Sequence, residues 1–222
     1  MGFDDCYPCG HAAAPRSELC DLVVPIAYGG YSHQSRTLLR DYKAPYRVAP
    51  GFEPFRNREE QILFALFVVG AIAHRPCLEY GGHPLSVIAA VPSTKYGADA
   101  PLVTLVDTIA QLMGLPRVVV GYSGPVGDAA RAYLPHYYHP DPSDLLEGAH
   151  VLVIDDTWVS GARAESTAAS LKWEGAHRVT ALTAGRWLSR GKAPSDFYFD
   201  HAESLPPYDP RICPVTGGGC LT

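Results

Sequence analysis

Two adjacent carboxylates, Asp155 and Asp156, stand between an apolar run and a loop rich in hydroxyl groups. The run, residues 151–154, reads Val-Leu-Val-Ile, and the loop, residues 157–161, reads Thr-Trp-Val-Ser-Gly. Free N–H groups of such a loop, together with the start of a following helix, form a site for an anion such as phosphate. Two carboxylates there would repel the phosphate unless they held hydroxyl groups or a cation between them. A sugar phosphate meets both conditions, because its hydroxyl groups or a metal face the acids while its phosphate enters the loop.

The elements that position these residues follow from the surrounding pattern. The uninterrupted apolar run at residues 151–154 predicts a strand that is buried on both faces, as in a parallel sheet. After the loop, apolar residues recur at helical spacing, at Ala164, Ala168 and Leu171. A second strand over residues 178–184 completes a βαβ unit. The acids are therefore expected at the carboxyl end of a strand, beside the N-terminus of a helix.

Residues 151–163 resemble the signature of the type I phosphoribosyltransferases, which is an apolar strand, two acidic residues, and a loop ending in Thr or Ser followed by Gly. The resemblance implies binding of 5-phosphoribosyl 1-pyrophosphate (PRPP) with magnesium. It implies that Asp155 and Asp156 hold the ribose 2- and 3-hydroxyls, directly or through water. The residues implied at the 5-phosphate are Thr157, Trp158, Val159, Ser160 and Gly161. The alternative is an ordinary βαβ turn whose acids cap the helix, although the Gly-rich dinucleotide and Walker patterns are absent.

A second strand end matches the place of the pyrophosphate loop in this family. Residues 86–91 form a continuous apolar strand pattern that runs directly into Pro-Ser-Thr-Lys. The resemblance implies that the leaving pyrophosphate is held by Pro92, Ser93, Thr94 and Lys95, with Lys95 neutralising its charge. Arg131, which precedes the signature strand, is a further candidate catalytic residue. The alternative for the turn is a simple helix N-cap.

A second resemblance lies N-terminal to both of these motifs, in residues 28–43. An aromatic-glycine turn is followed by Arg36, two leucines and Lys43, behind an N-terminal cysteine pair. This arrangement is similar to the lead-in of the ComF family of competence-associated phosphoribosyltransferase-like proteins. The alternative is a solvated basic helix face. The chain departs from the ComF pattern after the pyrophosphate loop, where residues 95–97 read Lys-Tyr-Gly in place of an arginine-glycine pair.

The cysteines suggest a separate, structural metal site. Cys6 and Cys9 form a C-x-x-C pair, and Cys213 and Cys220, at the other end of the chain, are separated by six residues. Tetrahedral zinc needs four soft ligands, so these four cysteines could join the two ends around one zinc ion. His11 and Cys20 are substitute ligands, and Cys77 is expected in the core. The alternative is that the thiols carry no metal.

Length and charge narrow the function classes. The chain has 222 residues, enough for one α/β domain with a small appendage, and a net charge of −5, which argues against nucleic acid as the primary ligand. The longest apolar run, residues 62–73, is too short to span a bilayer, so no membrane partner is expected. The N-terminus lacks the pattern of a signal peptide, and a cytoplasmic location is the expectation.

The predicted fold is α/β, a doubly wound parallel sheet with a small N-terminal hood and a zinc knuckle. The predicted divisions are a hood at residues 1–82, a phosphoribosyltransferase-like core at residues 83–185 and a wrapping tail at residues 186–222. The function implied is a glycosyltransferase that moves the phosphoribosyl group from PRPP to an unidentified base or amine, with a homodimer left open. Two alternatives are a non-catalytic ComF-like accessory or ligand-sensing protein and a magnesium-dependent hydrolase.

Overall fold

A computed structural model describes residues 14–29, 34–43, 55–94, 100–127, 132–189, 191, 196, 199–201 and 208–220. The strands are β1 (Leu22–Gly29), β2 (Val87–Ala90), β3 (Arg117–Tyr122), β4 (Tyr138–Asp141), β5 (His150–Trp158) and β6 (Arg178–Trp187). The α-helices are α2 (Gln34–Asp41), α3 (Arg58–Val68), α4 (Arg75–Leu78), α5 (Pro101–Met113) and α6 (Ala162–Trp173). A π-helical turn, Val69–Ala73, continues directly from α3 and is followed by His74 and then α4. Short 3-10 turns lie at Arg16–Glu18, Pro135–Tyr137 and Ser143–Leu145.

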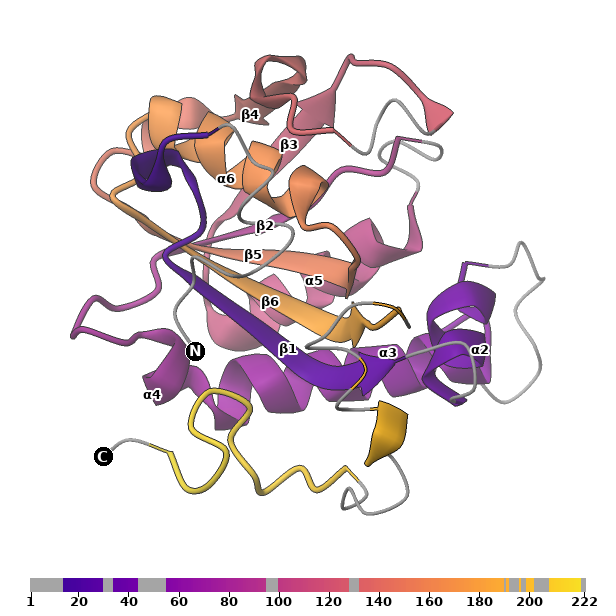
Figure 1. Ribbon diagram of the computed structural model, residues 1–222. Helices are drawn as coiled ribbons and strands as arrows, with labels where there is room; N and C mark the ends of the chain where they lie inside the picture. Colours follow the sequence, from indigo (N-terminus) through magenta and orange to yellow (C-terminus); the bar gives the residue numbers. More distant parts are fainter. Residues whose placement is uncertain are drawn as a thin grey trace.

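The strands form one six-stranded sheet in the order β1-β6-β5-β2-β3-β4, seen across the centre of Figure 1. Every pairing is parallel except that of β3 with β4. The register places Ile154 of β5 opposite Ala90 of β2, and Asp155 opposite Thr183 of β6. The carboxyl ends of these strands therefore lie at one edge of the sheet. The predicted α/β fold with a mostly parallel sheet is confirmed.

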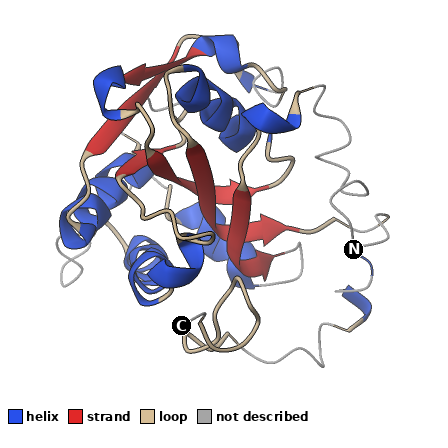
Figure 2. Ribbon diagram, turned by 90° about the vertical axis from the view of Figure 1, so that its left-hand side faces the viewer, coloured by secondary structure: helices blue, strands red, loops and turns tan. Residues whose placement is uncertain are grey.

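Helices cover both faces of the sheet, as Figure 2 shows from the side. On one face, Leu152 and Ile154 pack in a core with residues of α3 and α5. On the other face, Val151 and Val153 pack against α6. Because successive strand residues point to opposite faces, a strand buried on both sides must be apolar at every position. This burial explains the continuous run that predicted β5.

β1 and β4 form the two edges of the sheet. β1 runs through Pro25 without a break, because β1 pairs with β6 on one side only and an edge strand tolerates proline. β1 therefore belongs to the sheet although it lies in the segment predicted as a hood. The divisions at residues 82 and 185 stay predictions. β4, which lies antiparallel at the other edge, was not predicted from the Tyr- and His-rich stretch that contains it.

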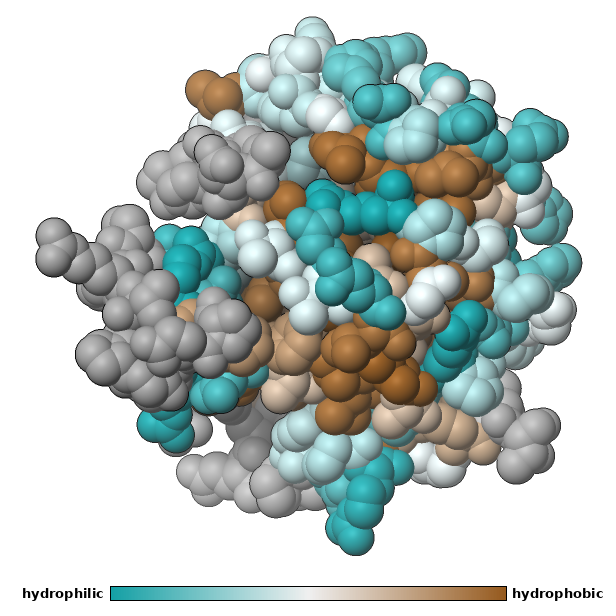
Figure 3. Space-filling model, turned by 180° about the vertical axis from the view of Figure 1, so that it is seen from behind, coloured by the Kyte–Doolittle hydropathy of each residue, from teal (hydrophilic) through white to brown (hydrophobic). Residues whose placement is uncertain are grey.

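The apolar run at residues 62–73 lies in a continuous helical segment formed by α3 and the π-helical turn. No helix in the described ranges is both long and apolar enough to cross a membrane. Seen from behind, the surface carries an apolar patch near its centre, bordered by hydrophilic side chains (Figure 3).

Candidate active site

The acid pair lies at the carboxyl end of β5, and both side chains are buried, with 4% of Asp155 and 5% of Asp156 exposed. The backbone N–H of Asp156 donates a hydrogen bond of 2.9 Å to a carboxylate oxygen of Asp155. A buried carboxylate is costly unless it is paired or hydrogen-bonded. The partners of these two acids therefore decide what the site can do.

Asp156 is held by two side chains that follow α2. The Tyr42 hydroxyl donates a hydrogen bond to its Oδ2, and the Lys43 ammonium forms an ion pair with the same oxygen. Burial alone would raise the pKa of Asp156, but the Lys43 charge and the two hydrogen bonds outweigh it and hold this pKa below its usual value. Burial and the Asp156 charge raise the pKa of Tyr42 well above its usual value. Asp156 is thus ionised at neutral pH and Tyr42 is a hydrogen-bond donor.

Asp155 has a different environment. Its Oδ1 lies 3.7 Å from Nη2 of Arg163, which comes from the first turn of α6. Burial, followed by the neighbouring Asp156 charge, raises the pKa of Asp155 to about 6. Burial would lower the pKa of Arg163, but Asp155 and then Asp156 outweigh it and raise that pKa. The two acids therefore face two cations, Lys43 and Arg163, so the site as a whole does not repel an anion.

The loop after the acids is shorter than predicted. Thr157 and Trp158 belong to β5, because β6 continues far enough to pair with them at Gly185 and Arg186. This corrects the predicted loop of residues 157–161. Its remaining residues, 159–161, connect β5 to α6, and Val159 and Ser160 are exposed. The Ser160 hydroxyl accepts a hydrogen bond of 3.4 Å from the Ala162 N–H.

Gly161 closes this loop with a left-handed backbone, φ +77°, at the N-cap of α6. A Cβ at this position would overlap the buried indole ring of Trp158. A side chain is therefore excluded by both the backbone conformation and the close approach of the ring. The first turn of α6 has N–H groups without partners inside the helix and the positive end of the helix dipole, which together favour an anion.

The predicted pyrophosphate turn lies next to the acids. The Val91 N–H donates to the Ile154 carbonyl at 2.9 Å, which fixes the end of β2 beside the end of β5. Pro92 is buried, and Ser93 and Thr94 are partly exposed. A pocket of about 150 Å³ lies at this junction. Its lining brings together Tyr42, Lys43, Val91, Ser93, Thr94, Ala100, Pro101, Leu102, Asp156 and Arg163.

A second pocket, of about 250 Å³, shares Pro92 and Ser93 with this region. It runs along β3, from Arg117 to Tyr122, and is bounded on the α5 side by Val103. Its lining is largely apolar, with residues such as Val103, Val119 and Tyr122. The turn at residues 92–94 thus lies between two pockets, and Asp156, Lys43 and Arg163 line only the first of them.

Several predicted residues lie outside the described part of the chain. These are Lys95 and Arg131 among the candidate catalytic residues, and Cys6 and Cys9 among the predicted zinc ligands. Lys43, which matched the ComF-like lead-in, lies at the acid pair. Tyr42 and the role of Arg163 were missed by sequence reasoning. The only signals for them were the adjacency of Tyr42 to Lys43 and the position of Arg163 as the last residue of the stretch that resembles the signature.

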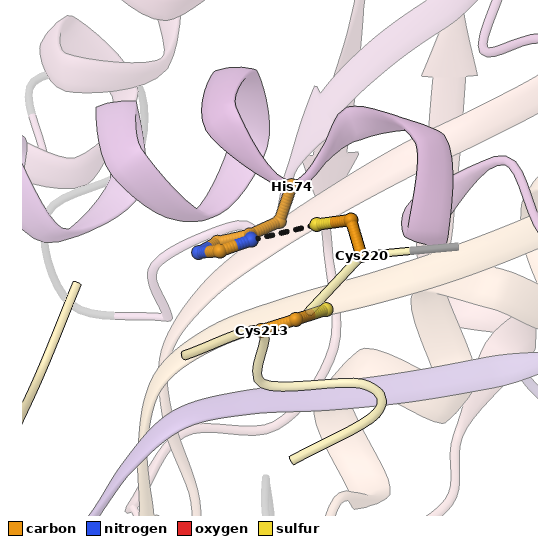
Figure 4. Close-up of side chains that lie close together, drawn as sticks. All are labelled: His74, Cys213 and Cys220. Carbon is orange, nitrogen blue, oxygen red and sulfur yellow. Dashed lines mark hydrogen bonds between the residues drawn. The ribbon is translucent and has the colours of Figure 1, made fainter. Parts of the chain in front are cut away.

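The remaining predicted zinc ligands, Cys213 and Cys220, lie together beside His74, which was not predicted as a ligand. Figure 4 shows the three side chains converging, with Nδ1 of His74 3.1 Å from Sγ of Cys220. Cys77 is fully buried, as predicted, and its thiol also interacts with those of Cys213 and Cys220. The substitute ligand Cys20 lies elsewhere, where its N–H donates to Glu165 at 2.7 Å.

Comparison with known proteins gave no match to a family model and none to a curated protein. Solved structures with a similar chain path include adenine phosphoribosyltransferase from Saccharomyces cerevisiae, at 15% identity and a TM-score of 0.42, covering 78% of this chain and 96% of that chain. Orotate phosphoribosyltransferase from Aeropyrum pernix is similar at 16% identity and a TM-score of 0.38, covering 64% of this chain and 66% of that chain. These likenesses do not assign this chain an activity.

Proposed function

We propose that this protein binds PRPP at the carboxyl edge of its sheet and transfers the phosphoribosyl group to a nitrogen nucleophile. The observation that carries the proposal is the convergence of three elements at one pocket. The acid Asp156, the Ser93–Thr94 turn and the cations Lys43 and Arg163 all line it. A pentose carrying phosphate groups at two positions has hydroxyl groups for the acids and anions for the cations and helix termini.

Each element has a proposed role that matches its chemistry. Asp155 and Asp156 accept hydrogen bonds from the ribose 2- and 3-hydroxyls. The 5-phosphate is held by Thr157, Ser160 and the amides up to Gly161, at the start of α6. The two residues between them, Trp158 and Val159, shape this loop, the first by packing against Gly161.

The leaving pyrophosphate is proposed to occupy the turn at Pro92, Ser93 and Thr94. The N-terminus of α5 supports this assignment, because Ala100 and Pro101 line the same pocket and the positive end of the helix dipole favours an anion. Lys95 and Arg131 are proposed to add positive charge. Both stay predictions, since they lie outside the described residues.

Magnesium is proposed as the cofactor, and the oxygen-rich donor set fits it. Mg²⁺ prefers carboxylate and phosphate oxygens and retains several waters. Within the part of the chain that the structure describes, Asp155 has no ion pair closer than 3.7 Å, whereas Asp156 is engaged by Lys43 and Tyr42. Asp155 would therefore hold the ion, directly or through water. When bound, magnesium supplies charge neutralisation for the pyrophosphate oxygens.

In the proposed reaction, the bond between the anomeric carbon and the pyrophosphate oxygen breaks as the nitrogen nucleophile forms its bond to that carbon. Positive charge develops on the sugar ring, and negative charge develops on the leaving oxygen. Fixed donors and cations aimed at developing charge lower the barrier because they need no rearrangement during the reaction. Lys43, Arg163 and the turn at residues 92–94 are the described groups that would act in this way.

A non-catalytic ComF-like role, binding PRPP as a sensor or accessory factor, is the second candidate. One observation favours it: the described acids already have partners, Tyr42 and Lys43 on Asp156 and Arg163 near Asp155. A resting site whose charges are satisfied can bind a ligand without turnover. Closeness to the ComF family, the homodimer and the cytoplasmic location remain predictions.

Product analysis separates transfer, hydrolysis and binding alone. PRPP labelled at its β-phosphate is incubated with the protein, Mg²⁺ and a panel of purine, pyrimidine and amine acceptors. Transfer predicts pyrophosphate release that depends on one acceptor, with formation of its phosphoribosyl adduct. Release without an acceptor would indicate the hydrolase, and no release despite tight PRPP binding would indicate the sensor.

The variant Asp155→Asn keeps the side-chain size and an oxygen acceptor but removes the charge. It should weaken PRPP binding and turnover together, by roughly 10-fold to 100-fold if one charged hydrogen-bond acceptor is lost. Asp144→Asn is the matched control, because Asp144 is exposed in the 3-10 turn before β5. Equal kinetics for wild type and Asp155→Asn would remove this residue from the site.

A further inference from the structure

A second cluster of reactive side chains lies away from the acids, beside the segment that joins α3 to α4. The ligand atoms of His74, Cys213 and Cys220 all lie within 4.8 Å of one another. His74 and Cys213 are buried, and Cys220 is partly exposed. A tetrahedral zinc ion with Zn–S distances of about 2.3 Å has its ligand atoms roughly 3.8 Å apart. The cluster thus has the dimensions of a site for one metal ion.

The C-terminal loop is built to bring its two cysteines together. The Cys213 N–H donates to the Gly218 carbonyl, and the Gly217 N–H donates to the Cys213 carbonyl, each at 2.8 Å. Gly217 has φ +71°, a conformation that favours glycine. The Thr216 hydroxyl donates to the Gly219 carbonyl at 2.8 Å and accepts from the Gly218 N–H at 3.2 Å. These hydrogen bonds fold residues 213–220 into a tight loop whose two sulfur atoms lie within 4.8 Å of each other.

His74 is oriented as a metal-bound histidine would be. Its Nε2 lies 3.1 Å from the Pro210 carbonyl, which can only accept a hydrogen bond, so this nitrogen carries the proton. The other nitrogen, Nδ1, then presents its lone pair toward Cys220. Metal-ligating histidines commonly donate their second N–H to a carbonyl or carboxylate, which fixes the ring. The π-helical turn at Val69–Ala73 ends directly before His74, which is its C-cap.

Cys77 is a candidate for the fourth ligand, although its sulfur is not among the ligand atoms that all lie within 4.8 Å of one another. It follows His74 by three residues in the same helical turn, and residues at this spacing lie on one face of a helix. Its thiol interacts with the thiols of both Cys213 and Cys220. We propose that His74, Cys77, Cys213 and Cys220 bind one Zn²⁺ ion. Three thiolates and one imidazole form a ligand set that suits tetrahedral zinc.

The site is structural, because four protein ligands leave no open position for a substrate. It lies near α4, at the end of the sheet away from the arrowheads of β5 and β6 in Figure 1. The Thr180 hydroxyl, near the start of β6, donates to the Leu78 carbonyl of α4 at 3.3 Å and fixes this placement. Zinc would attach the loop at residues 208–220 to the helices under the sheet, where Val215 also packs against the core.

The first test is the metal content of the full chain, purified without chelators, followed by cobalt substitution. The proposal predicts one Zn²⁺ per chain. After removal of zinc, Co²⁺ should restore binding with tetrahedral d–d bands and thiolate-to-cobalt charge-transfer absorption of a three-thiolate site. This spectrum is measured on the wild-type chain, so it tests the ligand set even where a variant fails to fold. A chain that binds neither Zn²⁺ nor Co²⁺, or that contains a disulfide between Cys213 and Cys220, would overturn the proposal.

Variants then separate this ligand set from one that uses the N-terminal pair. Cys220→Ser and His74→Gln should lose the zinc or weaken its retention against a chelator at least 10-fold. Cys6→Ser/Cys9→Ser should retain one zinc. Cys20→Ser is the matched control, because Cys20 is a thiol beside Glu165 and outside the cluster. Loss of the metal in Cys6→Ser/Cys9→Ser with retention in Cys220→Ser would refute the assignment.

Discussion

The two ends of the sheet carry opposite kinds of chemistry. The carboxyl edge holds two buried carboxylates that face two cations and a pair of helix N-termini. The cluster near α4 holds an imidazole and thiols, brought together by a tight loop. The first edge has hard oxygen ligands beside a pocket, and the second end has soft ligands in a closed arrangement.

This difference indicates where a ligand can enter. Around the acids, a pocket remains open between the turn at residues 92–94 and the start of α6. Around Cys213, the described side chains leave only Cys220 partly exposed. One end is suited to exchange a small molecule, and the other is suited to hold the chain together. The predictions below test whether these two roles can be separated.

The largest effect is expected at Gly161, which closes the loop between β5 and α6. Gly161→Ala forces a side chain into the ring of Trp158 as well as into a left-handed backbone. We expect the free energy of unfolding to fall by about 2–4 kcal/mol, with PRPP binding lost. Urea denaturation and calorimetry measure the two effects.

Gly114→Ala is the matched control for this substitution. Gly114 also has a positive φ, +65°, but a Cβ there would meet nothing within 4 Å. It caps α5, so its cost should be limited to the backbone term, about 1 kcal/mol, with PRPP binding retained. Equal costs for the two variants would mean that the contact between Trp158 and Gly161 does not shape the loop.

The two acids should show opposite dependence of stability on pH. The folded pKa of Asp155, about 6, lies above its unfolded value, so its ionised form destabilises the fold as pH rises from about 4 to about 7. Asp155→Asn removes this loss and should gain stability relative to wild type across that window. Urea denaturation at a series of pH values measures the difference.

Asp156 should behave in the reverse sense. Its folded pKa is lowered, so its ionised form stabilises the fold above the unfolded pKa, and this contribution disappears as pH falls through the folded value. Asp156→Asn should therefore destabilise the protein at pH 7, and the deficit should shrink in acid. The same sign of change for both variants would show that the two environments are not distinct.

A smaller effect is expected from Tyr42→Phe. This change removes the hydroxyl that donates to Asp156 but keeps the buried ring. A hydrogen bond to a charged group contributes about 1.5–3 kcal/mol, and the remaining Lys43 ion pair should offset part of the loss. We expect weaker PRPP binding by roughly 10-fold. Tyr137→Phe, at an exposed tyrosine in the 3-10 turn before β4, is the control.

The smallest effect on PRPP binding is expected from a substitution in the metal cluster. His74→Gln is expected to lower the melting temperature but to change the PRPP dissociation constant by less than about 2-fold wherever the variant folds, because distant sites are usually independent. Thermal denaturation and calorimetry on the same sample give both values. A large loss of PRPP affinity in a folded variant would mean that the two ends are coupled.

Local pattern was sufficient to predict the sheet and the acid edge. An apolar run followed by two carboxylates and a glycine-containing loop defines β5 and its end within a few residues. Tyr42 could not be paired with Asp156 in this way, because 114 residues separate them. The contact between His74 and Cys220 could not be predicted for the same reason, because 146 residues separate them.

The length of β5 depended on tertiary contacts as well. Thr157 and Trp158 were predicted as loop because they follow the acids, but β6 supplies a hydrogen-bonding partner strand for both. Such pairing is decided by the neighbouring strand and not by the residues themselves. β4 was missed for a related reason, since it pairs only with β3 at the edge.

The most direct test of the proposed function is calorimetric binding of PRPP with Mg²⁺ to the wild type and to Asp155→Ala/Asp156→Ala. The proposal predicts micromolar binding by the wild type and none by the double variant, with Asp144→Asn binding like wild type. Circular dichroism of each sample establishes that it is folded. Absence of binding by folded wild type, or equal binding by the double variant, would contradict the assignment of PRPP to the acid pair.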